Sequence, residues 1–480
     1  MTISDAQFNA WLKNDNKERV VLAEAKYYNS GQFTRYLSTH GFVSGPSDTP
    51  ANIVYDDLIA SVPAITSELN MPFGVGDIDL VNDGSLDAWL QDSWDGRQLL
   101  LLIGDASWSR DDFRQISSLM IESFEVASND KMRFRVRDKR ERININAQSS
   151  YFTSGAAIGK PKPLCVGKVF NITPILISAP LHKYQVHDGP INAITDVRDN
   201  GVSVAHTATL SDGTFVLSQQ PVGRITCDVE GAKPQGVYHT KTADIVRYLL
   251  EREVLIGSDF DDDNLTAFNT LVPYAMGAFM SSRENLISVI DLITKSTGSY
   301  WLFNRLGQLA LWQLDSVTGT AIARFDSDDI IDNTFMFVRS QLPVSRVAVG
   351  YQKNHTLQND TAGAVTELNR ALYSDTNSVQ AETNADIRTT HPLAEESDTL
   401  DTLISLSADA ATEAARLAAM RDVIRFTYEA EFSTGPFQIK LGDEINVTYP
   451  RFGFADGLNV IVAGLDEMPA DNKIKVRFWL

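Results

Sequence analysis

The stretch from Lys160 to Gly201 constrains the fold most, because turn-forming residues interrupt it at short intervals. Glycine reaches positive φ, proline fixes φ, and asparagine and aspartate tolerate the left-handed region, so clusters of these residues favour the ends of strands. We therefore predict short β-strands joined by tight turns over this stretch. The turn signals are Lys-Pro-Lys-Pro at 160–163, Gly167, His-Asp-Gly-Pro at 187–190 and Asp-Asn-Gly at 199–201.

Changes in pattern divide the 480 residues into units. The length alone favours about three domains, at roughly 150 residues each. Helical periodicity begins at about residue 240, where Thr242 and the run Ser281–Glu284 are predicted to start helices. Residues 354–402 are polar and lack clear periodicity, which predicts a long loop or an extended arm. The predicted units are a β domain at 1–150, a β domain at 151–237, an α+β domain at 238–344 and a mainly β domain at 345–480 with a long helix at 407–426.

The charge balance excludes one broad class of function. The chain has 62 acidic and 42 basic residues, a net charge of −20. Affinity for phosphate backbones comes from lysine and arginine, so general nucleic-acid binding is not expected. An acidic surface suits high solubility, or a wall that DNA must pass without sticking. The first residues lack the layout of a signal peptide, so we expect synthesis in a cytoplasm without membrane insertion.

Candidate metal ligands are sparse. Cys165 and Cys227 are far apart and form no CxxC pair, so burial as free thiols is the favoured interpretation. Asp259, Asp261 and Asp263 resemble the start of a calcium loop, but the glycine and the bidentate glutamate of such a loop are missing. A solvated acidic loop is favoured there over a weak cation site. Turn or surface roles are likewise favoured for Asp77, Asp79 and Asp83.

No residue carries a recognisable catalytic pattern. The sequence contains no HExxH, GxSxG, Walker A or GxGxxG motif. His187 lies beside Asp188 in a predicted turn, and adjacency in sequence does not establish a catalytic dyad. Two carboxylates of a glycosidase pair cannot be picked out from the many present. We expect no catalytic residue, no metal and no cofactor.

One basic segment is a candidate contact surface. Lys131–Arg142 holds seven lysines or arginines, and Arg133, Arg135 and Arg137 share one face of a predicted strand whose other face is apolar. The first interpretation is a solvated or ion-paired strand. The second is a subunit contact to acidic neighbours, and direct DNA recognition is opposed by the overall charge.

Short motifs along the whole chain resemble those of one protein family. Each is weak alone, but their order is that of baseplate or tail-tip proteins of long-tailed, siphovirus-like bacteriophages, most closely the tail hub class. The motifs are Tyr55-Asp56, Asn82–Asp87, Gly104-Asp105, Arg137–Arg140, Pro163, Gly167–Ile172, Pro174, Tyr184–Gly189, Thr297-Gly298, Trp301, Asn304–Gly307, Leu309, Pro343, Val347–Tyr351, Asn354, Leu441–Asp443, Val447, Pro450-Arg451 and Gly457.

The resemblance implies a fold, an assembly and a set of partners. Similar hub proteins contain tail-tube-like β-barrel domains and form trimeric rings that continue the hexameric tail tube. One barrel is then expected in the N-terminal half and another within 345–480, with β and α+β domains inserted. The implied partners are further copies of the chain, the distal tail protein, the tape measure protein and a receptor-binding or fibre protein, with DNA only in transit through the lumen. The implied location is the virion tail tip, after assembly in the host bacterial cytoplasm.

Three alternatives remain beside a non-enzymatic tail hub. A hexameric distal tail adaptor belongs to the same machine and differs in copy number. A tail-associated cell-wall hydrolase would need a carboxylate pair that the sequence does not identify. A carbohydrate-binding sandwich would need exposed aromatic side chains, whereas we expect at least two of Trp89, Trp94 and Trp108 to be buried.

Overall fold

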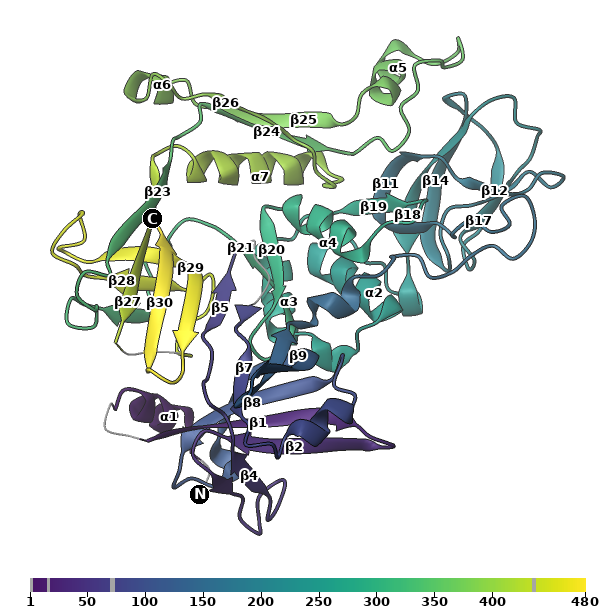
Figure 1. Cartoon of the computed structure of the whole chain (residues 1–480). Helices are drawn as coiled ribbons and strands as arrows, with labels where there is room; N and C mark the ends of the chain where they lie inside the picture. Colours follow the sequence, from purple (N-terminus) through teal and green to yellow (C-terminus); the bar gives the residue numbers. More distant parts are fainter. Residues whose placement is uncertain (1–2, 15–17, 70–73, 434–436) are drawn as a thin grey trace.

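The N-terminal part is an eight-stranded sheet that curves around its own core. The computed structural model describes residues 3–14, 18–69, 74–433 and 437–480 (Figure 1). The strand order is β3-β4-β2-β1-β8-β9-β10-β7. In β10 the predicted alternation is confirmed, because Met132, Phe134 and Val136 are buried while the basic residues between them face outward. The elements are α1 (Asp5–Leu12), β1 (Arg19–Tyr28), β2 (Gln32–Ser38), β3 (Phe42–Val43), β4 (Val54–Asp57), β7 (Ile78–Val81), β8 (Gln98–Asp105), β9 (Arg114–Ser128) and β10 (Lys131–Arg137).

The turn-rich stretch belongs to a β unit of two sheets packed face to face. The predicted turn at 199–201 is confirmed by Asn200 and Gly201, which lie in the left-handed region between β14 and β15, and Gly213 has a positive φ in the turn between β16 and β17. The sheet orders are β15-β14-β18-β11-β19 and β12-β13-β17-β16. The strands are β11 (Leu164–Ile172), β12 (Ile175–Ser178), β13 (Lys183–Gln185), β14 (Ile191–Asp199), β15 (Val202–Ser203), β16 (His206–Thr209), β17 (Thr214–Leu217) and β18 (Ile225–Ala232).

Gly167 does not form the predicted turn but lies inside β11. Residues before it pair with β19, and residues after it pair with β18. Its φ is +62°, and a Cβ atom here would lie 1.9 Å from the carbonyl oxygen of Met276. The glycine therefore serves a close approach of two strands, where the strand changes its pairing.

The helical unit after residue 240 forms as predicted, although its helices begin at other residues. The N-cap of α2 is Lys241 rather than Thr242, and the N-cap of α4 is Asn285, whose side chain accepts a hydrogen bond from the amide of Ile287. The apolar stripe of α4 faces the core with Leu286, Val289 and Ile290. The elements are α2 (Thr242–Glu253), α3 (Asp262–Leu271), β19 (Gly277–Met280), α4 (Leu286–Lys295), β20 (Ser299–Phe303) and β21 (Leu309–Gln313).

Two corrections concern residues 346–426. The polar segment expected to be a loop contains two strands that flank β24 in a three-stranded sheet, β25-β24-β26, which α7 covers (Figure 1). The helix predicted at 407–426 ends at Met420, and the strand β27 begins at Arg425. The elements are β24 (Arg346–Tyr351), α5 (Glu367–Ser374), β25 (Ser378–Thr383), α6 (Ile387–Thr390), β26 (Glu396–Leu400) and α7 (Ser407–Met420).

A second large sheet closes the chain and completes a mainly β, multi-domain fold with an α+β unit, as predicted. Its main path is β22-β28-β29-β30-β27-β23, and β5 and β6 from the N-terminal part of the chain join it at β29. The strands are β22 (Ala323–Phe325), β23 (Met336–Gln341), β27 (Arg425–Phe432), β28 (Glu444–Val447), β29 (Leu458–Met468), β30 (Lys473–Trp479), β5 (Ile65–Glu68) and β6 (Gly74–Val75).

The hydrophobic cores follow these units only in part. Each large sheet has its own core. The largest core extends from Ile143 to Leu417 and combines α2, α4 and α7 with β24, so apolar packing is continuous across the predicted boundary at 344/345. In the described part of the chain, no helix is long and apolar enough to cross a membrane.

Replacing Gly167 by alanine should destabilise the protein strongly. The left-handed φ alone costs roughly 1–2 kcal/mol, and the clash with the Met276 carbonyl should add at least about 2 kcal/mol. Gly159→Ala is the matched control, because Gly159 also has positive φ (+77°) but a Cβ atom there meets nothing within 4 Å. Chemical unfolding followed by far-UV circular dichroism compares the two, and equal losses would contradict the role assigned to the close approach.

Candidate assembly site

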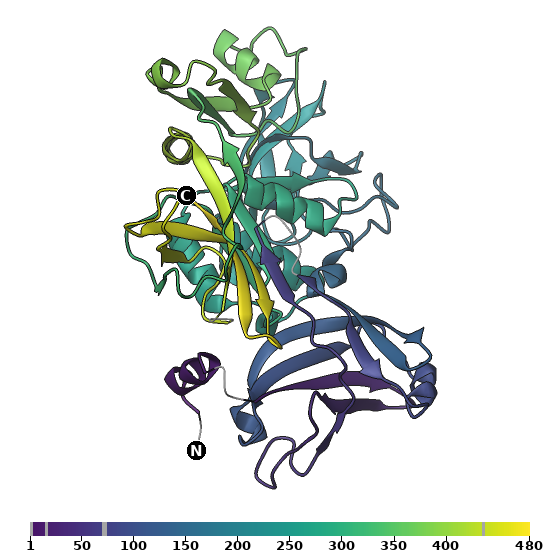
Figure 2. The same ribbon diagram turned by 60° about the vertical axis from the view of Figure 1, so that its left-hand side comes forward.

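One strand joins the two large sheets. β5 runs antiparallel to the second half of β29 (Figure 2). Ile65 lies opposite Glu467, and Glu68 lies opposite Gly464. The first half of β29 pairs with β28, and β30 occupies the other edge of β29. β5 therefore lies on the same edge of β29 as β28, next to the second half of the strand. Through β5, the N-terminal part of the chain contributes a strand to the C-terminal sheet.

An arginine holds this junction together. The Arg477 guanidinium lies 2.6 Å from the Glu68 carboxylate on β5 and 3.1 Å from the Asp466 carboxylate on β29. Its Nε lies 3.5 Å from Glu429 on β27, which also contacts Lys475 at 2.9 Å. The planar guanidinium suits this geometry because it presents donors in several directions at once. One side chain thus links three strands from both ends of the chain.

A buried carboxyl group lies at the same junction. Glu467 is opposite Ile65, and its Oε1 accepts a hydrogen bond from the amide of Phe437 at 2.5 Å. Burial raises the pKa of Glu467 to about 7, against the opposing effect of the Arg305 charge. Arg305 itself lies over the Phe437 ring and donates to the carbonyl of Gln115 on β9. The N-terminal sheet, the β20–β21 turn and the C-terminal sheet therefore meet here.

The two large sheets contain the same four-strand motif. β8, β9 and β10 form a meander with β7 beside β10, and β28, β29 and β30 form a meander with β27 beside β30. All pairs in both motifs are antiparallel, and the chain order of the strands is identical. We call these motifs the N-terminal repeat and the C-terminal repeat.

The equivalence of the two repeats extends to single hydrogen bonds. Both meanders have a bulge at the same place, at Glu122 of β9 and at Ala463 of β29. Gly96, with φ +69°, donates to the carbonyl of Ile121, and Gly442, with φ +82°, donates to the carbonyl of Val462. The bridge of Ile59 to Leu80 corresponds to that of Ile330 to Phe432. In this alignment Val126 corresponds to Glu467, Arg135 to Arg477, and Ser123 to Gly464.

The predicted contact residues lie on the last strand of the N-terminal repeat. Each of Arg133, Arg135 and Arg137 is ion-paired within the chain, to Asp79, Glu125 and Glu122 respectively, with closest distances of 2.7 Å for the first two pairs. Their charges are therefore matched before any subunit contact forms. A contact to another subunit stays a prediction.

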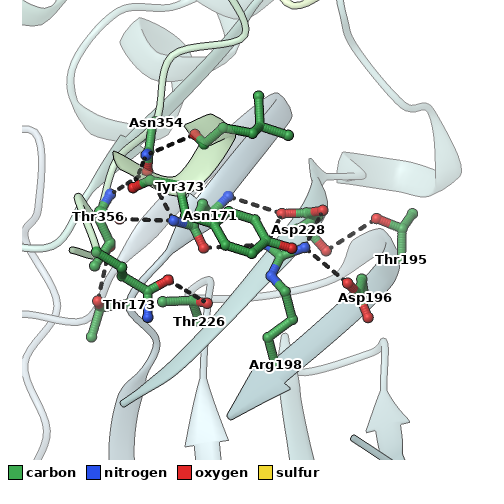
Figure 3. Close-up of polar contacts among 12 residues, drawn as sticks. Asn171, Thr173, Thr195, Asp196, Arg198, Thr226, Asp228, Asn354, Thr356 and Tyr373 are labelled. Carbon is green, nitrogen blue, oxygen red and sulfur yellow. Dashed lines mark hydrogen bonds and ion pairs between the residues drawn. The ribbon is translucent and has the colours of Figure 1, made fainter. Parts of the chain in front are cut away.

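A buried polar cluster fixes the segment 354–373 on the middle β unit (Figure 3). The Arg198 side chain is only 3% exposed and bonds to Asp196 at 2.8 Å and to Asp228. The guanidinium also stacks over the rings of Phe170 and Tyr373. Asn171 donates to Asn354 Oδ1 at 2.9 Å. These contacts bond the Arg198 guanidinium and the Asn171 amide to groups of the protein, which is a positioning role.

The remaining candidate residues have structural partners. His187 is buried, its Nδ1 accepts from the amide of Cys165 at 3.0 Å, and burial lowers its pKa to about 3, so the ring is neutral. Cys165 and Cys227 are buried free thiols, as expected. Asp259 pairs with Lys139 at 2.7 Å, and Asp261 caps α3.

Three further groups complete the outcome for the predicted sites. Trp89 and Trp94 are buried, as expected, and Trp108 is half-buried. Asp79 pairs with Arg133, and the Asp83 carboxylate accepts from the amide of Ser85 in a turn. Across the described ranges, no group of three or more histidines, cysteines or acids is arranged to hold a metal.

Sequence reasoning missed the junction residues Glu68, Arg477 and Glu467. A signal was present in the two final strands, because Lys131–Arg137 (KMRFRVR) and Lys473–Trp479 (KIKVRFW) share the same alternation of basic and apolar residues. A search for repeats of 20–50 residues does not find it, since the two strands lie far apart in the chain.

Glu467→Gln should remove a pH dependence of stability. The folded-state pKa of about 7 lies above the ordinary value of 4.5, so the folded state binds the proton more tightly. The stabilisation is complete below pH 4.5 and is lost as the pH rises through about 7. The variant should therefore gain relative stability across this window, up to about 3 kcal/mol at its upper end. Chemical unfolding at a series of pH values measures this, with the exposed Asp398→Asn as the control. Parallel profiles for Glu467→Gln and the unchanged protein would refute it.

Arg477→Met should loosen β5. Loss of the ion pairs to Glu68, Asp466 and Glu429 should lower the free energy of local opening at β5 by about 1.4 kcal/mol. Amide exchange at residues 65–68 should therefore become about tenfold faster. Arg135→Met is the matched control, because Arg135 holds the equivalent place but pairs with Glu125 of β9. Hydrogen–deuterium exchange with mass spectrometry reports the difference. Unchanged protection in Arg477→Met would contradict the importance of this arginine.

The fold is similar to those of three tail proteins of known structure, at low identity. The tail protein from Neisseria meningitidis MC58 is 9% identical, with 96% of each chain covered and a TM-score of 0.42. The 43 kDa tail protein of prophage MuSo2 from Shewanella oneidensis is 9% identical, with 96% of this chain and 98% of that chain covered and a TM-score of 0.41. The prophage tail protein gp18 from Listeria monocytogenes EGD-e is 7% identical, with 96% and 94% covered and a TM-score of 0.43. No protein-family model and no curated protein matches the sequence.

Proposed function

We propose that this protein is a structural component of a phage tail tip, a hub whose copies form a ring that continues the tail tube and conducts DNA during ejection. The observation that carries the proposal is the internal duplication. Each chain contributes two sheets that share a four-strand motif with the same chain order, a bulge at the same place and equivalent turn hydrogen bonds. Three chains therefore supply six equivalent units, which matches a six-fold tube with a three-fold ring.

The junction at β5 supports the same proposal. A ring needs its units at fixed angles, and the β5–β29 ladder with the Arg477 ion pairs fixes the two repeats of one chain relative to each other. A flexible linker between the repeats would leave that angle open. The ladder and the ion pairs together make each chain a rigid third of the ring.

The charge distribution supports a passage for DNA. The chain carries a net charge of −20. Moreover, the arginines on the final strands of both repeats, together with Lys475, are paired with acids of the same sheets. Phosphates attract unpaired lysine and arginine, so a wall of this kind holds DNA weakly.

The role is proposed to be assembly rather than catalysis. In support, His187, Glu467 and Asp259 are buried groups that already bond to protein partners. The proposed partners are further copies of the chain, the distal tail and tape measure proteins and a receptor-binding or fibre protein. The proposed location is the virion tail tip, reached after assembly in the host cytoplasm.

Native mass spectrometry and negative-stain imaging of the purified protein test the proposal. We expect a species of three times the chain mass of 53.1 kDa and rings with a central channel. A species of six chains would instead favour a hexameric distal tail adaptor. Monomers alone at tens of micromolar would contradict the ring, and clearing of purified peptidoglycan by the same preparation would contradict the non-catalytic role.

A further inference from the structure

The C-terminal sheet has an exposed, apolar edge strand. β23 pairs with β27 on one side, and all six of its residues are exposed. Met336, Phe337 and Val338 are 47%, 53% and 44% exposed. Folded proteins usually blunt such an edge with lysine, proline, a very short strand or a covering element, since its free backbone groups pair readily with another strand. β23 has the properties of a strand that another chain covers.

The N-terminal sheet has an open edge in its longest strand. β9 pairs with β10 as far as Ser128, but on its other side the ladder with β8 reaches only from Arg114 to Met120. Among the described residues, no strand pairs with residues 123–128 on that side. Val126 is 58% exposed there. The edge is long enough to accept one more short strand.

The internal duplication relates these two edges. In the C-terminal repeat, residues 464–467 of β29 are equivalent to residues 123–126 of β9, and β5 fills their outer edge. β5 is the first strand after the Ile59–Leu80 bridge, just as β23 is the first strand after the Ile330–Phe432 bridge. On its other edge, β5 pairs with β6, the strand that directly precedes β7 in the chain. The corresponding edge of β23 pairs with the first half of β27. β5 and β23 thus hold equivalent places. The outer edge of β5 is occupied by β29, whereas the outer edge of β23 pairs with no described strand.

We propose that β23 of one copy pairs antiparallel with residues 123–126 of β9 in the next copy, repeating between chains the pairing that β5 makes with β29 within a chain. This inference rests on the proposed ring and names its interface. Because donor and acceptor are different surfaces, the contact is head-to-tail and closes a ring when the rotation permits.

The charges of the two strands fit this pairing. β23 carries Arg339 and no acid, whereas residues 122–128 of β9 carry no base and two acids, Glu122 and Glu125, each of which also pairs with an arginine of β10. The pairing of β5 with β29 within the chain is also complementary in charge. There the added strand β5 carries the acid, Glu68, and the sheet that receives it carries the base, Arg477. The exposed apolar side chains of β23 would be covered together with Val126, which gains the burial that Glu467 has in the other repeat.

Site-specific cross-linking tests the interface in the full chain. Val338→p-benzoylphenylalanine should, on irradiation, give a covalent dimer whose cross-linked peptide contains residues 122–128 of another copy. Val222→p-benzoylphenylalanine is the matched control, because Val222 is a 92% exposed valine outside both strands. A Val338 cross-link to any other region, or none in assembled rings, would overturn the inference.

Val338→Asp provides a second measurement. A charge at this exposed position should leave the monomer folded, as checked by circular dichroism, and abolish rings at concentrations where the unchanged protein assembles. If the unchanged protein forms rings and Val338→Asp forms them equally well, the interface is wrong and the proposed function stands. If the unchanged protein never forms rings, the proposed function itself fails, and the interface with it.

Discussion

The pairing of β5 with β29 is the constraint on which the rest of the structure depends. A sheet edge presents backbone donors and acceptors that need partners, and β5 supplies them for half of β29. The Arg477 ion pairs and the burial of Glu467 both arise around this ladder. Without it the two large sheets would lose the backbone ladder that joins them. With it, their relative orientation is set by backbone hydrogen bonds together with the ion pairs of Arg477.

The two repeats show how one architecture is kept while side chains change. The ladder, the bulge at Glu122 or Ala463 and the glycine at 96 or 442 are backbone features, which many sequences can satisfy. A bulge bends its strand and increases the local twist, so its equal position gives both sheets similar curvature. The side chains on that frame then diverge. A valine in one repeat corresponds to a buried glutamate in the other, and only the latter is covered by a strand of its own chain.

Local patterns predicted local structure well and distant contacts poorly. The alternation in Lys131–Arg137 and the apolar stripe of α4 depend on neighbouring residues, and both are confirmed. Gly167 was expected to form a turn. Instead, a glycine is needed there because the Met276 carbonyl, more than one hundred positions away, leaves no space for a Cβ atom. β25 and β26 are short, polar and exposed, so they lack the alternation that identifies a strand. At the candidate site, Arg133, Arg135 and Arg137 were found by their spacing, whereas Glu68 and Arg477 matter only as a pair that sequence order hides.

The separation of Glu68 from Arg477, 409 positions, also governs the order in which the chain can fold. At the usual 5–20 residues per second, translation needs roughly 20 to 80 s between the appearance of the two residues. Throughout that time β5 has been made and its partner β29 has not, so the N-terminal sheet must be stable while β5 is not yet paired with β29. The native junction is therefore among the last parts to form during synthesis, and this interval exposes the chain to mispairing with other copies.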